Sequence, residues 1–103
     1  MKQAVEILRW GPIGEREMRS KMEALGYPAS RWVYSPGTVF DTHTHDADKL
    51  DAVVSGRFAL TMFGETVVLE AGDALYVPRG AAHRAEVIGD EPVVSLDGIK
   101  RAR

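Results

Sequence analysis

The chain has 103 residues, of which 45% are apolar and 27% are charged, and its formal net charge at pH 7 is −2. This length supports one domain with a single modest core, and the composition is typical of a folded globular protein. The charge argues against nucleic acid as a partner, because a phosphate-binding face needs clustered lysine and arginine. The chain has no cysteine, so disulfides and thiolate metal sites are excluded and any metal must bind nitrogen or oxygen.

The N-terminal segment has a strand signal followed by a helix signal. The apolar residues of "AVEIL" alternate, which indicates a short strand. In "GEREMRSKMEALG", Met18, Met22 and Leu25 recur at helical spacing, and Gly26 is placed to end the helix. The segment lacks the long apolar run of a signal peptide or a membrane span, so we expect a cytoplasmic protein with no membrane partner.

Short apolar runs alternate with turn residues from about residue 31 onward. Runs such as "TVFDTH", "GRFALTMF" and "TVVLEA" are separated by glycine, proline and aspartate. This pattern is typical of strands joined by tight turns. Seven or eight strands without a helix between them predict antiparallel pairing in a sandwich or barrel. We therefore expect an all-β fold with one short N-terminal α-helix. We expect residues 1–29 to form a strand and a helix packed on the barrel and residues 30–103 to form the barrel, the whole being one structural domain.

Two of the three histidines, His43 and His45, lie one residue apart in "THTH". On a strand both side chains point to the same face, roughly 6.6 Å apart along the chain, which can place two imidazoles on one metal. A pair alone is more often a polar rim or a hydrogen-bonded core pair. His83, in "PRGAAH", lies at the far end of the strand block, so a closed sheet can bring it opposite the pair.

The spacing around the histidines resembles the two motifs of the cupin family. The first motif is Gly, five residues, His-x-His, three or four residues, Glu, six residues and Gly, and its positions here hold Gly37, His43, His45, Lys49 and Gly56. The second is Gly, five residues, Pro-x-Gly, two residues, His, three residues and Asn, and its positions here hold Gly72, Pro78, Gly80, His83 and Val87. The resemblance covers roughly residues 30 to 97, and only Lys49 and Val87 depart from it.

The resemblance implies a jelly-roll barrel, or double-stranded β-helix, of six to eight strands. It also implies that His43, His45 and His83 are inward-facing metal ligands near the barrel mouth, and that the protein is a homodimer. The alternative is a barrel whose histidines are only structural.

The motif glycines and proline have a structural role independent of the family. Gly37, Gly72 and Gly80 lie at expected turns, where a positive φ is needed, and Pro78 stiffens the loop before His83.

Lys49 stands where the usual fourth ligand of the family is a glutamate. A protonated lysine has no lone pair for a metal, and a divalent metal about 5 Å away would repel it by roughly 6 to 7 kcal/mol at an effective dielectric of about 20. Lys49 must therefore lose its proton, turn out of the barrel or be held by acids, unless the metal is absent. Asp51 shares the face of Lys49 on a regular strand and Asp41 shares that of His43, so either can pair with it. Asp51 is also a candidate to approach the metal.

Three neutral imidazoles without a carboxylate leave open coordination positions, which suits Zn²⁺, Fe²⁺, Ni²⁺ or Cu²⁺ better than Mg²⁺ or Ca²⁺. Such a metal beside a lysine makes a positive pocket that favours a small anionic molecule. Two functions remain open: a metal-dependent oxygenase, isomerase or lyase, and a non-catalytic ligand- or metal-binding sensor. No catalytic residue is assigned.

Overall fold

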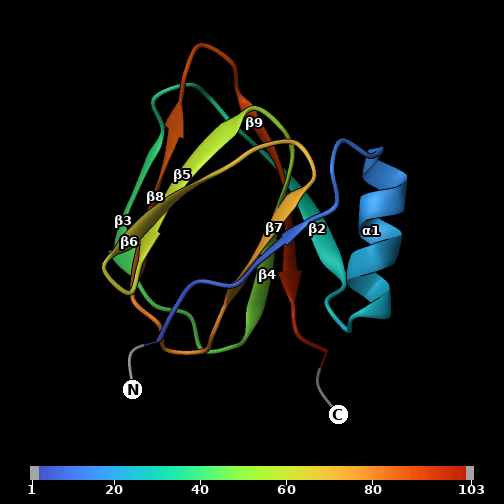
Figure 1. The fold of residues 1–103 in the computed structure, drawn as a ribbon, viewed down its shortest axis with the longest axis horizontal. Coiled ribbons are helices and arrows are strands. Elements are labelled where there is room, and N and C mark those ends of the chain that lie inside the picture. Colours follow the sequence, from blue (N-terminus) through green and yellow to red (C-terminus); the bar gives the residue numbers. More distant parts are fainter. Residues whose placement is uncertain (1–2, 102–103) are drawn as a thin grey trace.

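The computed structural model describes residues 3–101, whose strands form two antiparallel sheets facing each other (Figure 1). One sheet has the strand order β1-β7-β4-β9-β2 and the other the order β3-β8-β5-β6. The elements are β1 Ile7–Arg9, α1 Glu15–Ala24, β2 Ala29–Tyr34, β3 Val39–His43, β4 Lys49–Ser55, β5 Arg57–Met62, β6 Glu65–Leu69, β7 Asp73–Val77, β8 His83–Ile88 and β9 Val93–Ile99. The prediction of an all-β fold with one short helix is confirmed over these residues.

The central strand β4 is buried on both faces and separates two apolar cores. Successive side chains of a strand point to opposite faces. Leu50 and Ala52 therefore point outward and pack against Met22 of the helix, whereas Lys49 and Asp51 point into the barrel and line its cavity. The interior core itself draws on both sheets and includes Val53, Phe58, Leu60, Met62, Leu69, Leu75, Val77, Ala85, Val87 and Val93.

The helix α1 lies outside the barrel, against the five-stranded sheet (Figure 1). Met18 and Met22, two of the three residues at helical spacing, lie on the face that meets the sheet and are fully buried. Gly26 has a φ of +94°, and the N–H of Tyr27 donates to the carbonyl of Met22 at 2.8 Å, which is a Schellman end to the helix. Leu25, the third of these residues, is 45% exposed because the helix ends at the residue before it. Within residues 3–101, no helix has the length and apolar composition needed to cross a bilayer.

The N-terminal strand is joined to the barrel at a glycine contact. β1 is an edge strand paired with β7, and the N–H of Trp10 donates to the carbonyl of Gly72 at 2.8 Å. Gly72 has a φ of +92°, and a Cβ placed on it would lie 1.8 Å from the carbonyl oxygen of Gly11. The predicted positive φ at Gly37, Gly72 and Gly80 is confirmed.

Replacing Gly72 by alanine should lower the free energy of unfolding by about 2 to 5 kcal/mol, since the left-handed conformation costs about 1–2 kcal/mol and overpacking about 1–3 kcal/mol. Gly64→Ala is the matched control, because Gly64 has a φ of +75° with no atom within 4 Å of the added Cβ. Only the conformational cost of about 1–2 kcal/mol applies there. Urea unfolding of both variants measures the difference, and equal losses would contradict the close approach to Gly11.

Candidate metal centre

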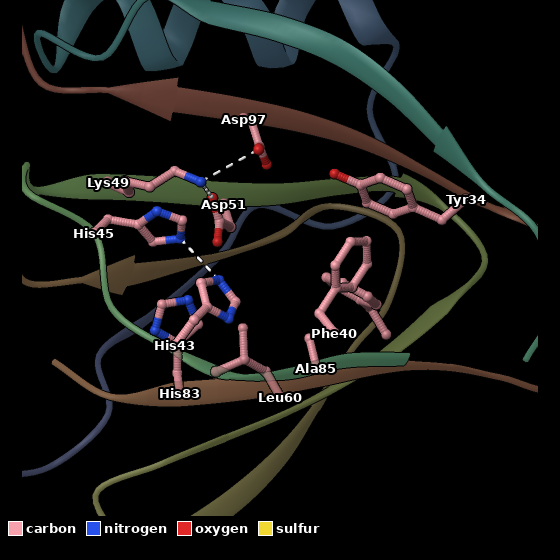
Figure 2. Close-up of a pocket in the computed structure, with 11 residues that line it drawn as sticks. Tyr34, Phe40, His43, His45, Lys49, Asp51, Leu60, His83, Ala85 and Asp97 are labelled. Carbon is pink, nitrogen blue, oxygen red and sulfur yellow. Dashed lines mark hydrogen bonds and ion pairs between the residues drawn. The ribbon is translucent and has the colours of Figure 1, made fainter. Parts of the chain in front are cut away.

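The barrel fold brings the three histidines together at one end of its interior. His43 ends β3 and His83 begins β8, and these two residues are direct partners in the antiparallel register. His45 follows in the connection to β4. The ligand nitrogens of the three side chains all lie within 4.8 Å of one another, and Figure 2 shows the rings clustered beside the cavity.

Backbone carbonyls orient two of the three imidazoles. Nδ1 of His43 lies 2.7 Å from the carbonyl oxygen of Asp41, and Nδ1 of His83 lies 2.9 Å from that of Ala81. A carbonyl oxygen only accepts hydrogen bonds, so each Nδ1 carries the proton and donates it. Nε2 of His43 and Nε2 of His83 therefore carry no proton and have a lone pair for a metal, as in metal-binding histidines whose other ring nitrogen is held in place.

The spacing of one pair of ligand nitrogens matches that of two ligands on one transition-metal ion. Nε2 of His43 lies 3.1 Å from Nε2 of His45. Two nitrogens about 2.0–2.1 Å from one ion lie roughly 2.9 to 3.4 Å apart for ligand angles between octahedral and tetrahedral values. Two of the imidazoles are also held neutral: burial, and then the nearby Lys49 charge, lower the pKa of His45 from 6.5 to about 4. Burial lowers the pKa of His83 in the same way.

Lys49 points into the cavity and is held there by two aspartates. Its Nζ lies 3.3 Å from Oδ1 of Asp51 and 3.2 Å from Oδ2 of Asp97, and its side chain is 9% exposed. Burial lowers the pKa of Lys49, but the two carboxylates outweigh burial and the net shift is upward. Lys49 therefore keeps its charge, and of the alternatives open from the sequence, capture by acids is the arrangement the fold adopts.

Asp51 is the more deeply buried of the two carboxylates. It lies directly opposite Asp97 in the register between β4 and β9. Burial, and then the neighbouring Asp97, raise the pKa of Asp51, although Lys49 opposes the shift. Two carboxylates thus compete for one ammonium, and the charged form of the more buried Asp51 is disfavoured.

One side chain expected from the sequence lies outside the cavity, and one inside it was missed. The side chain of Asp41 is exposed, and this residue contributes only its carbonyl, because the pairing register shifts between Phe40 and His43. Asp97 was missed, and the available signal was its position in a strand-like run, "VVSLDG".

The cavity beside the histidines has a volume of about 140 Å³. Figure 2 shows the histidines and Lys49 toward one end, and Tyr34 and Phe40 toward the other. These two rings meet edge to face with centroids 4.8 Å apart, and Phe58 packs against both. The cavity therefore offers a polar end and an aromatic end to one small molecule.

Comparison with known proteins identifies the family. Residues 30–98 match the family described as the Cupin domain. The chain is a cupin. The solved structure of a cupin 2 domain-containing protein from Halorhodospira halophila matches this cupin with a TM-score of 0.73 and 18% identity, covering 98% of this chain and 80% of that one. The predicted double-stranded β-helix, or jelly-roll, fold is thereby confirmed.

Two curated relatives are enzymes by name. The nitrosourea synthase of Streptomyces achromogenes subsp. streptozoticus is 29% identical over 89 residues, which is 85% of this chain. The oxalate decarboxylase OxdC of Bacillus subtilis (strain 168) is 35% identical over 71 residues, or 63% of this chain. The cupin described here spans only 18% of the length of each relative.

The lowered histidine pKa values predict a pH dependence of stability for the metal-free protein. Unfolded His45 takes up a proton near pH 6.5, whereas folded His45 does so only near pH 4. At His45 the unfolded state therefore binds more protons between these values, which lowers the free energy of unfolding as the pH drops through that window. The raised pKa of Asp51 acts in the opposite direction, so the contribution of His45 is measured as a difference. In urea unfolding with a chelator, the wild type should lose more stability, or gain less, than His45→Gln as the pH drops. Identical pH profiles for both proteins would contradict the assignment.

Proposed function

We propose that this cupin binds one divalent transition metal, Zn²⁺, Fe²⁺, Ni²⁺ or Cu²⁺, through Nε2 of His43, His45 and His83, and holds a small anionic molecule beside it. The observation that carries the proposal is the convergence of three imidazoles, two of which are fixed by backbone carbonyls with Nε2 unprotonated. Imidazole nitrogen suits these metals.

The charge around the site supports an anionic ligand. Lys49 is balanced by Asp97, and Asp51 adds at most one negative charge. A divalent ion held by neutral histidines therefore gives the site a net positive charge whether or not Asp51 is ionised. The relative named as an oxalate decarboxylase acts, by its name, on a small dicarboxylate, which is the same class of molecule.

Different residues of the cavity would bind the metal, attract the anion and orient its apolar part. The metal, when bound, would supply a Lewis acid with open positions for an oxygen ligand. Lys49 would attract the anion, and the aromatic end of the cavity would hold apolar atoms. Oxygenase, isomerase and lyase chemistry are all compatible with this arrangement. A non-catalytic binding module is the second candidate, since both inward carboxylates are engaged with Lys49.

The homodimer implied by the family resemblance is also part of the proposal. β2 is an edge strand of its sheet and exposes Trp32 and Val33, which are 53% and 54% exposed. Trp32→Glu should convert the dimer to a monomer in sedimentation equilibrium. Val68→Glu, on the exposed edge strand β6 of the other sheet, should leave it dimeric. A wild-type monomer would contradict the dimer.

Metal binding is tested by elemental analysis and titration calorimetry. Wild-type protein should bind about one equivalent, and His83→Ala should weaken the affinity more than about a hundredfold, because even residues that only orient ligands contribute 10–100-fold. Asp46→Asn is the matched control, since Asp46 adjoins His45 but its side chain is 89% exposed. Equal binding by His83→Ala and the wild type would contradict the site.

Anion binding is tested by thermal unfolding of the metal-loaded protein with oxalate. Oxalate should raise the melting temperature, whereas its neutral diamide, oxamide, should not. Lys49→Met should weaken oxalate binding by about tenfold, because a nearby positive charge is lost. Equal shifts with oxalate and oxamide would show that charge does not govern binding.

A further inference from the structure

The carboxyl group of Asp51 has hydrogen-bonding capacity that the protein does not use. Its side chain is 10% exposed, and Oδ1 is buried at the ion pair with Lys49, 3.3 Å from Nζ. Asp51 also lines the cavity, and Figure 2 shows its second carboxylate oxygen turned toward that cavity. A carboxylate oxygen accepts more than one hydrogen bond, so this oxygen can accept one from a bound molecule.

The position of Asp51 says which part of a ligand would supply this donor. Asp51 lines the same cavity as the three histidines. Figure 2 shows it on the polar side of the cavity, with Tyr34 and Phe40 further along. A molecule bound through an oxygen anion at the histidines therefore has Asp51 beside its head and the aromatic rings beside its tail.

Building on the proposed function, we propose that the ligand is a small 2-hydroxycarboxylate with an apolar side chain. Its carboxylate lies at the three histidines, its hydroxyl donates to Asp51, and its apolar group packs on Tyr34 and Phe40. Three groups of the ligand thus define its class: a hydroxyl that donates a hydrogen bond, a carboxylate and an apolar side chain.

The donor is a hydroxyl rather than an ammonium because of Lys49. Its charged Nζ is 3.3 Å from the Asp51 oxygen, and a second cation on that carboxylate would be repelled at short range. The size of the cavity limits the remainder of the molecule. A cavity of about 150 Å³ holds benzene, so a volume of about 140 Å³ suits an acid with a branched side chain of three carbons.

The test compares 2-hydroxy-3-methylbutanoate with 3-methylbutanoate, which lacks only the hydroxyl, by calorimetry on the zinc-loaded protein. We expect the hydroxy acid to bind about tenfold more tightly, as one hydrogen bond to a charged group predicts. Valine, with an ammonium in place of the hydroxyl, should bind at least tenfold more weakly than the hydroxy acid. Equal affinity for the hydroxy acid and either analogue overturns the inference.

Asp51→Ala separates the role of Asp51 from chelation of the metal by the hydroxyl. The preference for the hydroxy acid should fall to about one in this variant. Asp73→Ala is the matched control, because Asp73 is also a buried, ion-paired carboxylate but lies outside the cavity, and it should keep the preference. A preference that survives in Asp51→Ala means that the metal holds the hydroxyl, and overturns the inference.

Two further measurements keep the outcomes distinct. The two enantiomers of the hydroxy acid should bind wild-type protein with different affinities, because hydroxyl and apolar group must face opposite walls. Equal affinities overturn the inference even if Asp51→Ala does not fold. Zinc content is determined on the same samples: absent zinc overturns the proposed function, whereas bound zinc with equal binding of both acids overturns only this inference.

Discussion

The buried ammonium of Lys49 is the constraint on which the polar end of the barrel depends. An unpaired charge in a protein interior costs several kcal/mol, and the fold meets this cost with Asp51 and Asp97 from two adjacent strands. The same charge contributes to the lowered pKa of His45. One cation thus explains why two acids lie inside the barrel and helps to explain why a neighbouring histidine is neutral at pH 7.

The two aspartates also reduce the electrostatic repulsion between the Lys49 ammonium and a metal ion bound by the histidines. A bare ammonium about 5 Å from a divalent ion would be repelled by roughly 6 to 7 kcal/mol at an effective dielectric of about 20, and an ion pair with Asp97 offsets much of this repulsion. Because two carboxylates share one ammonium, Asp51 keeps acceptor capacity on the side that lines the cavity. The departure from the family pattern at position 49 therefore changes the ligand that the site can take, while the three imidazoles stay in place.

Local patterns predicted more of the fold than of the cavity wall. Alternation and turn residues predicted the strands, and motif spacing brought His83 to the other two histidines. Asp97 escaped prediction because its place beside Lys49 depends on the register between β4 and β9, which forms over more than forty residues of intervening chain. Asp41 was placed by strict alternation with His43, but the register shift in β3 breaks that alternation. His45 lies beyond the end of β3, so its approach to His43 comes from the loop conformation.

The most direct test of the three-histidine metal site is a crystal structure of the zinc-loaded protein with data collected at the zinc absorption edge. The account predicts one anomalous peak inside the barrel, about 2.0–2.1 Å from Nε2 of each of the three histidines, with Lys49 still paired to Asp51 and Asp97. Zinc found only at surface carboxylates, with the three imidazoles left as they are, would contradict it.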